Sequence, residues 1–413
     1  MTGSSGTFRS LRNRNARLFF GGLLVSNVGT WLQSTATSIL VYRLTGQATA
    51  LGVAVALQFV PMLFVGAWAG AVADRRDKRT MCIATQSVLA AQALALAVLD
   101  FAGLASVGAV YVLAFVLGVA NAFDNPARRG LVVELVDKDD ISNAMSLNTA
   151  VMTGSRIFGP ALAAVMVGPF GTAWCFAMNA VSFAAVLASL FALDRSAIRP
   201  SPRAPRGGTP VRDALRFVVS SPSLLVLHLV LIVVSTFAFN YSVSLPKLSA
   251  VRWGDERWFG WVLAMVSVGS VIGSLTVASR RRATLRMFFA SLVLMSAAGP
   301  AVAWAPSGWW AFVGAVPLGI GGAGFMASFN GVVQQQSPDD MRGRLLALSA
   351  VAFLGSTPIG GPVTGVIADR IGAEWSLAYG SFITLATVIV ATIALSTGKP
   401  QVPARGTEGT LTA

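Results

Sequence analysis

The chain has 413 residues, of which 54% are hydrophobic and only 12% carry a charge. Soluble globular proteins carry about 25% charged residues, so this composition excludes a water-soluble enzyme, a disordered chain and a fibrous protein. The 31 Lys and Arg exceed the 17 Asp and Glu, which gives a formal net charge of +14. Either a basic nucleic-acid-binding protein or a multi-pass membrane protein with basic loops would explain that charge.

Twelve stretches of the chain are apolar and long enough to cross a bilayer as a helix, which takes about 20 residues. The first is too long for a cleaved signal peptide, and further spans follow it. The pattern therefore predicts an all-α membrane protein with twelve transmembrane helices. The predicted spans are residues 18–42, 48–73, 80–100, 105–126, 142–167, 171–193, 223–245, 258–279, 285–304, 308–332, 345–368 and 375–396.

The basic residues gather in every second loop between these spans. If the N-terminus is cytoplasmic, the cytoplasmic segments hold 25 of the 31 Lys and Arg, the outer segments hold five, and Arg156 lies within a span. Cytoplasmic loops of membrane proteins carry such an excess of positive charge. We therefore expect a multi-pass protein of the bacterial inner membrane with both termini in the cytoplasm, and the charge requires no nucleic acid to explain it.

A linker rich in Pro, Gly and Arg divides the spans six and six. It predicts an N-terminal bundle of residues 1–194, a cytoplasmic linker of residues 195–222, and a C-terminal bundle and tail of residues 223–413. Within the linker, residues 211–219 fit a short amphipathic helix at the lipid headgroups.

The two halves repeat a pattern around the fifth and eleventh spans. Six helices separate the counterparts, so both copies cross the membrane in the same direction, and such a parallel repeat predicts a substrate path between the halves. Each Gly-Pro pair is interpreted as a hinge, with a packing kink as the alternative. The matching pairs are Asp139-Asp140 with Asp339-Asp340 before the spans, and Gly159-Pro160 with Gly361-Pro362 inside them.

The string GAVADRRDKR, from Gly70 to Arg79, resembles the signature loop G-x-x-x-D-R-x-G-R-K of the major facilitator superfamily, although Asp77 stands where the family has glycine. The resemblance implies a cytoplasmic latch in which Asp74 faces the positive N-terminus of the eleventh span. A loop that only anchors positive charge in the cytoplasm is the alternative. The predicted latch comprises Gly70, Asp74, Arg75 and Arg79, with Asp124 and Arg128 beside it.

Two further strings, AFDNPARR at residues 122–129 and SRIFGPAL at residues 155–162, resemble the exporter branch that includes the enterobactin exporter and macrolide efflux proteins. The resemblance implies two pseudo-symmetric six-helix bundles that rock about a central site. It also implies export of a hydrophobic or amphipathic small molecule, such as a drug, a siderophore or a secondary metabolite, by proton antiport. An importer of a nutrient on the same fold is the alternative, because the latch does not encode direction.

Two charged residues near the spans are candidates for coupling. Asp124 is the only acid near the fourth span, and it either joins a cytoplasmic charge cluster with Arg75 and Arg128 or carries a proton. Arg156 lies within the fifth span, where a charge is costly unless it is paired or hydrated. Its partner would be Asp124 or an anionic group of the substrate, unless the span starts later and the side chain reaches the interface.

Polar residues inside the spans are candidates for lining a cavity, although each could instead bond to a neighbouring helix. The sequence shows no nucleotide-binding loop, catalytic cluster or metal site, so we expect a monomeric transporter rather than an enzyme, with a small-molecule substrate, protons and lipid as partners and no cofactor. A structural membrane protein is the remaining alternative. The cavity candidates are Asn27, Thr30, Gln33, Gln58, Asn148, Asn179, Asn240 and Asn330.

Overall fold

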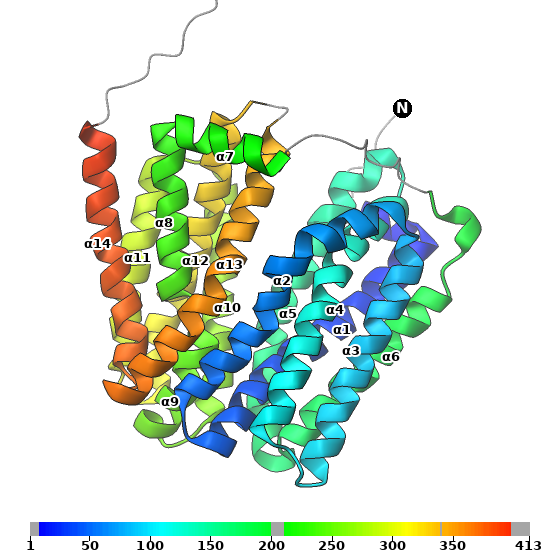
Figure 1. The fold of residues 1–413 in the computed structure, drawn as a ribbon, viewed down its shortest axis with the longest axis horizontal. Coiled ribbons are helices and arrows are strands. Elements are labelled where there is room, and N and C mark those ends of the chain that lie inside the picture. Colours follow the sequence, from blue (N-terminus) through cyan, green and yellow to red (C-terminus); the bar gives the residue numbers. More distant parts are fainter. Residues whose placement is uncertain (1–7, 200–209, 339–340, 398–413) are drawn as a thin grey trace, which may run out of the picture.

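The computed structural model describes residues 8–199, 210–338 and 341–397 (Figure 1). Within these ranges every regular element is a helix, as the sequence predicts, and short 3-10 helices lie at Arg9–Arg12, Lys138–Asp140 and Arg195–Ala197. The repeat pair Asp339-Asp340 lies outside the described residues. The helices are α1 Arg14–Thr45, α2 Ala48–Arg75, α3 Lys78–Phe101, α4 Val107–Glu134, α5 Ile141–Phe170, α6 Thr172–Phe191, α7 Pro210–Ser220, α8 Pro222–Ala238, α9 Tyr241–Trp253, α10 Arg257–Ala278, α11 Leu285–Ala303, α12 Gly308–Gln336, α13 Arg342–Arg370 and α14 Trp375–Thr397.

The helices stand in two groups (Figure 1). Helices α1 to α6 form one group, α8 and α10 to α14 form the other, and α7 lies across the upper end of the second group. We call that upper end the basic end, because α2 ends there at Arg75 and Arg280, Arg281 and Arg282 follow α10 there. The opposite end, where α9 lies, is called the far end.

Eleven helical segments of the described chain are long and apolar enough to cross a membrane. The first helix, α1, is not among them, although it is 32 residues long and packs against α5 and α6. The sequence predicts a span at residues 18–42, but Asn27, Thr30 and Gln33 lower its hydropathy. The same three residues line a cavity described below, so the polarity of α1 follows from its position.

The predicted seventh span, residues 223–245, is two helices instead of one. Helix α8 ends at Ala238, α9 begins at Tyr241, and Phe239 and Asn240 between them are not helical. The Asn240 side chain donates a hydrogen bond to the Thr236 carbonyl at 2.7 Å, which replaces a backbone partner and competes with the helix. Gly360 of α13 also packs against this carbonyl, since a Cβ on Gly360 would lie 1.8 Å from it.

The two groups contact each other at the far end through the helix pairs α2–α13 and α5–α10. Glycine makes both contacts possible, because a side chain would collide with the opposite backbone. A Cβ on Gly52 would lie 2.4 Å from the Gly361 carbonyl oxygen, and one on Gly260 would lie 2.6 Å from that of Pro160. Towards the basic end the two groups diverge (Figure 1).

Helix α7 includes residues 211–219, for which the sequence predicts an amphipathic helix. Its apolar face is buried at Ala214 and Val218, which pack into the core of the second group. On its polar face, Asp213 forms an ion pair with Arg344 of α13 at 3.6 Å. Helix α7 is therefore attached to the basic end of the second group through both faces.

Candidate functional site: a central cavity and its two ends

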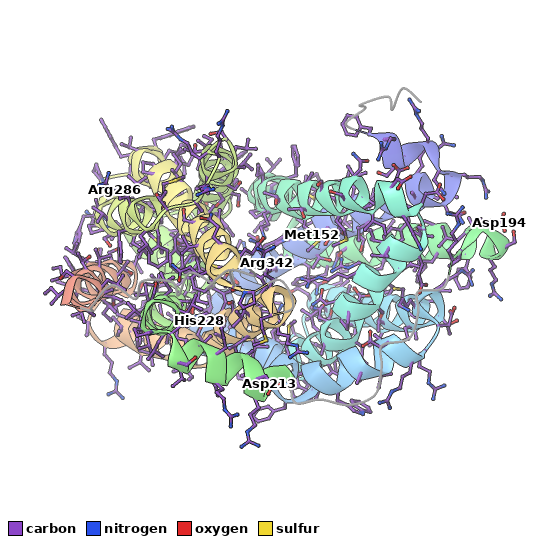
Figure 2. All side chains as sticks on the ribbon, turned by 90° about the horizontal axis from the view of Figure 1, so that it is seen from above. Met152, Asp194, Asp213, His228, Arg286 and Arg342 are labelled. Atoms are coloured by element: carbon purple, nitrogen blue, oxygen red, sulfur yellow. The ribbon has the colours of Figure 1, made fainter. Side chains whose placement is uncertain are left out.

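A cavity of about 510 Å³ lies between the two groups of helices. Both groups line it, the first through α1 to α6 and the second through the α8–α9 break, α10 and α13. Seen from the basic end, Met152 of the cavity wall and Arg342 at the start of α13 lie near the boundary between the groups (Figure 2). Of the predicted cavity residues, Asn27, Thr30, Gln33, Gln58 and Asn240 line this space.

The other three predicted cavity residues, Asn148, Asn179 and Asn330, are not among the lining residues. Asn179 is buried and donates to the Gln33 side chain at 2.7 Å, while Gln33 donates to Gln92 at 2.9 Å. This amide chain joins α6, α1 and α3. Asn179 has therefore satisfied its polar atoms between helices, which is the alternative that the sequence left open.

Asp124 is fully buried at the cavity wall and is held by three side chains. It accepts hydrogen bonds from Thr85 at 2.8 Å and Gln86 at 2.9 Å, and its other oxygen lies 3.5 Å from Arg128. Arg128 also donates to Asn125 at 2.8 Å. The charge of Asp124 is thus compensated by Arg128, one helical turn away on the same helix, and not by Arg75, which is exposed.

Arg156 projects into the cavity from the middle of α5. Its guanidinium carbon lies 5.1 Å from the ring centre of Trp31, an arrangement typical of a cation–π contact. Within the described part of the chain, Arg156 has no carboxylate partner. Asp124, which the sequence suggested as its partner, forms its ion pair with Arg128 instead.

The predicted latch at the basic end is not assembled in this structure. Asp74 is exposed and has no hydrogen bond or ion pair to the described residues, and a Cβ on Gly70 would meet no atom within 4 Å. Arg79 instead is buried and donates to the carbonyl oxygens of Leu190 at 2.7 Å and Phe191 at 3.3 Å, which caps the end of α6. Arg79 therefore joins α3 to α6 within one half.

The structure explains why Asp77 departs from the family pattern. Asp77 is the N-cap of α3, and its carboxylate accepts a hydrogen bond from the Thr80 N–H at 2.6 Å. Partial burial works to raise the pKa of Asp77, but the hydrogen bonds from Thr80 and the nearby positive charges of Arg79 and Arg195 outweigh it, so the pKa lies below its ordinary value.

A second latch, which the sequence analysis missed, closes the far end. Asp369 at the end of α13 accepts hydrogen bonds from the backbone N–H groups of Ala48 at 2.9 Å and Thr49 at 2.8 Å, which open α2. Lys247 of α9 contacts the same carboxylate at 2.7 Å. Gly365 allows the approach, because a Cβ there would lie 2.5 Å from the Thr49 Cα. We call this arrangement the far-end latch.

A repeated hexapeptide in the sequence marks this latch. Residues 365–370 read GVIADR and residues 70–75 read GAVADR, so α13 and α2 end in nearly the same hexapeptide. A search for repeats between corresponding spans does not find it, because the second and eleventh spans are not counterparts in a parallel repeat.

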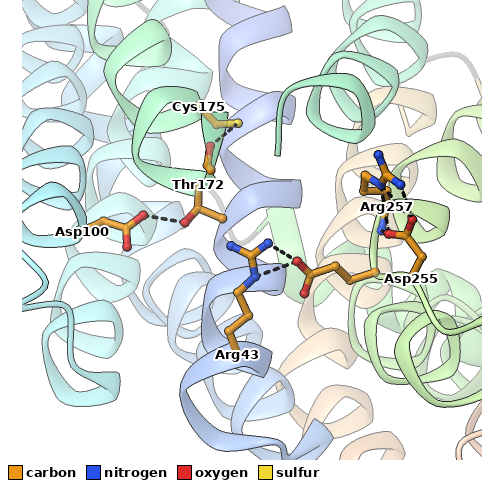
Figure 3. Close-up of polar contacts among 8 residues, drawn as sticks. Arg43, Asp100, Thr172, Cys175, Asp255 and Arg257 are labelled. Atoms are coloured by element: carbon orange, nitrogen blue, oxygen red, sulfur yellow. Dashed lines mark hydrogen bonds and ion pairs between the residues drawn. The ribbon is translucent and has the colours of Figure 1, made fainter. Parts of the chain in front are cut away.

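An ion pair supports the same closure from the neighbouring helices. Arg43 near the end of α1 pairs with Glu256 immediately before α10, which joins the two halves (Figure 3). Next to it, Asp255 accepts from Arg257 within its own loop. These hydrogen bonds outweigh the partial burial of Asp255 and lower its pKa. Several charged contacts therefore seal the far end.

The two Gly-Pro pairs lie at contacts between helices. A Cβ on Gly159 would lie 2.3 Å from the Trp31 Cβ of α1, and Gly361 faces Gly52 of α2. Both α5 and α13 continue as helices through Pro160 and Pro362. Close packing explains the glycines, and hinge motion at these positions stays a prediction.

This architecture of two helix groups around a central cavity is that of a major facilitator transporter. The solved structure of the nucleoside transporter NupG superimposes with a TM-score of 0.74 over 94% of this chain and all of that one, at 12% identity. At that identity the comparison establishes the fold alone.

The chain belongs to the transmembrane secretion effector family of the major facilitator superfamily, whose model matches residues 5–405. It is similar to the multidrug efflux pump Tap of Mycolicibacterium fortuitum, at 26% identity over 84% of this chain and 88% of Tap. It is also similar to the staphyloferrin A transporter of Staphylococcus aureus, at 24% identity over 63% of this chain and 66% of that protein. The chain is therefore a membrane transporter and not an enzyme.

Proposed function

We propose that this transporter exports a hydrophobic or amphipathic small molecule across the bacterial inner membrane, by alternating access and in exchange for protons. The observation that carries the proposal is the central cavity of about 510 Å³, which both halves line while their contacts close its far end. In a parallel-repeat transporter such a cavity is the substrate site.

The distribution of positive charge supports transport out of the cytoplasm. The basic end faces the cytoplasm if the chain follows the positive-inside rule, which places both termini there. The far-end latch then seals the outer side, and the cavity receives its substrate from the cytoplasm. The efflux function named for the Tap relative supports the same direction.

The cavity wall supports an amphipathic substrate. It combines polar side chains such as Gln58 and Asn121 with aromatic and apolar ones such as Phe59, Met62 and Phe353. Binding pockets for small organic molecules have this mixture, in which apolar surface provides affinity and a few polar groups set the orientation.

Proton exchange is assigned to Asp124 because it is the only carboxylate among the described residues of the cavity wall. When it is protonated, its ion pair with Arg128 is lost. The group therefore connects proton binding to the contacts of α4 with α3 and α1.

The functional unit is proposed to be the monomer. A single chain contributes both halves of the cavity wall, both latch hexapeptides and the pair Asp124–Arg128.

The test compares everted and right-side-out membrane vesicles that contain the chain, with a panel of fluorescent hydrophobic compounds of either charge. We expect accumulation in everted vesicles with an acidic interior and its loss when a protonophore is added. Vesicles without the chain are the control. Accumulation driven into right-side-out vesicles by external acid would instead establish an importer, and no gradient-dependent transport in either orientation would contradict the proposal.

A further inference from the structure

The cavity carries uncompensated positive charge. Four charged side chains line it among the described residues, and two of them, Asp124 and Arg128, neutralise each other. The other two, Arg129 and Arg156, have no ion pair within the described chain. Arg156 lies at the middle of α5 and is exposed to the cavity, whereas Arg129 lies near the basic end of α4. A charge at the depth of Arg156 costs several kcal/mol unless water or a partner stabilises it. The cavity therefore favours a partner with negative charge.

The break between α8 and α9 brings two helix ends to the cavity wall, the C-terminus of α8 and the N-terminus of α9. Residues Asn240 to Val243 line the cavity, so the N-terminus of the 13-residue helix α9 opens onto it. The first N–H groups of a helix lack partners within the helix and carry its positive dipole end. Discontinuous helices of membrane transporters direct such ends at anionic substrate groups.

An unpartnered hydroxyl lies at the same place. The Tyr241 hydroxyl oxygen is buried and has no hydrogen-bond partner among the described residues, although Tyr241 lines the cavity. Buried polar atoms without a partner are uncommon in folded proteins. This oxygen is shielded from solvent, so it marks an unsatisfied polar atom next to the cavity wall.

We propose that the exported molecule is an organic anion. Its carboxylate or comparable acidic group would bind Arg156, with Arg129 and the N-terminus of α9 adding to the positive potential. Its apolar part would lie against the wall formed by Phe59, Met62, Phe239 and Phe353. This inference rests on the proposed function, which it narrows from any amphipathic molecule to an anionic one.

The test uses two probes of the same apolar shape and opposite charge, 1-naphthaleneacetate and 1-naphthylmethylammonium. Their binding to the purified transporter in nanodiscs of uncharged lipid is measured by displacement of radiolabelled naphthaleneacetate. We expect the anion to bind at least about tenfold more tightly than the cation, a factor typical of one charge-assisted contact. Arg156→Gln should remove that preference and Arg156→Lys should keep part of it. Arg286→Gln, a matched change at an arginine outside the cavity wall, should leave it unaltered.

Equal affinity for both probes, or a preference that survives in Arg156→Gln, would overturn the inference. Size-exclusion profiles of the variants show that a loss of binding is not a loss of folding. The vesicle assay separates the two proposals. Gradient-driven export of cations with no anion preference would contradict only the anionic substrate, whereas Arg156-dependent anion binding without transport would contradict only the exporter.

A different observation carries a second inference, about the twin hexapeptides. Helices α2 and α13 pack together in opposite directions, so GAVADR lies at the basic end and GVIADR at the far end of one helix pair. In the structure Asp369 caps α2, while Asp74 has no partner among the described residues and no described atom lies within 4 Å of a Cβ built on Gly70 or Gly343. We infer that the two hexapeptides form equivalent latches that close in turn, and that Asp369 is the outer counterpart of Asp74.

The test labels a single cysteine at Met152, in a chain whose buried Cys82 and Cys175 are replaced by alanine, with a membrane-impermeant maleimide. Asp369→Asn should weaken the far-end latch and raise the labelling rate from the far side severalfold. Asp74→Asn should lower that rate, because it favours the state seen here. Identical far-side labelling in Asp369→Asn and the parent chain would overturn the inference, and labelling from the basic side shows that each variant is folded and accessible.

Discussion

At the scale of single residues, the caps of the helices explain details of the sequence that a family pattern does not. Asp77 occupies a position where glycine is the usual residue, and it begins α3 by accepting the Thr80 N–H. Glycine is also an acceptable N-cap, whereas alanine is not. Aspartate and glycine can therefore both begin α3, and Asp77 in place of the family's glycine leaves the match to the motif intact.

We predict that Asp77→Ala lowers the free energy of unfolding by about 1 kcal/mol at pH 7, whereas Asp77→Gly lowers it by only a few tenths. Since the pKa of Asp77 is lowered by folding, its contribution is fully present above the pKa of the unfolded chain, about 3.9. It is lost as the pH falls through the folded value. Thermal unfolding in detergent, followed by tryptophan fluorescence, should show the wild type and Asp77→Ala converging below about pH 4. A constant difference down to pH 3 would contradict this role.

At the scale of elements, close helix packing depends on glycines whose Cβ would collide with a backbone. In the α10–α12 pair, a Cβ on Gly269 would lie 2.0 Å from the Val316 carbonyl oxygen, and one on Gly319 would lie 1.9 Å from that of Val266. Backbone atoms cannot move aside as a flexible side chain can. Small residues at such contacts let transmembrane helices approach closely.

We predict that Gly269→Ala destabilises the protein by about 1–3 kcal/mol, the usual cost of overpacking. Gly21→Ala is the matched control, because Gly21 lies in the interior of α1 and a Cβ there meets no atom within 4 Å. Alanine at that position should stabilise the helix by about 0.5–1 kcal/mol. Melting temperatures in detergent report both changes, and shifts of the same sign would contradict the packing argument.

Much of this element structure is predictable from the sequence. Eleven of the twelve predicted spans correspond to helical segments apolar enough for a membrane, and α1 differs because its polar residues face the cavity. The break at Phe239 and Asn240 was not predictable from hydropathy, since the predicted span 223–245 runs through it without a charged residue. The structure shows it through the bond from the Asn240 side chain to the Thr236 carbonyl and the close approach of Gly360. The sequence could not tell which polar residues line the cavity and which bond to another helix, because an amide such as Asn179 can do either.

At the scale of the whole molecule, the proposed alternating access requires one chain to encode more than one arrangement of its halves. The sequence contains both hexapeptides, of which only the one at residues 70–75 was identified from the sequence, and it does not say which of them is engaged. The structure adds that information, because Asp369 is engaged and Asp74 is exposed. Asp124 is the carboxylate of the cavity wall among the described residues, and its contacts with Thr85, Gln86 and Arg128 all lie within the first half.

We predict that Asp124→Asn abolishes transport driven by a pH gradient but leaves downhill exchange of substrate across proteoliposomes. Asparagine keeps contacts to Thr85 and Gln86 while removing the ion pair with Arg128 and the proton site. Asp213→Asn, at an ion pair on the exposed helix α7, is the control and should transport normally. Gradient-driven accumulation at the wild-type rate in Asp124→Asn would exclude this residue as the proton carrier.

The polarity of α1 has a consequence for the assembly of the protein in the cell. Because α1 is made first, it reaches the bilayer before α5 and α6, which later cover much of its surface. A segment that falls short of the apolarity of the other spans gains little from lipid by itself. We therefore expect α1 to depend on α5 and α6 for stable insertion, so that the polar residues lining the cavity also link the insertion of α1 to that of its later neighbours.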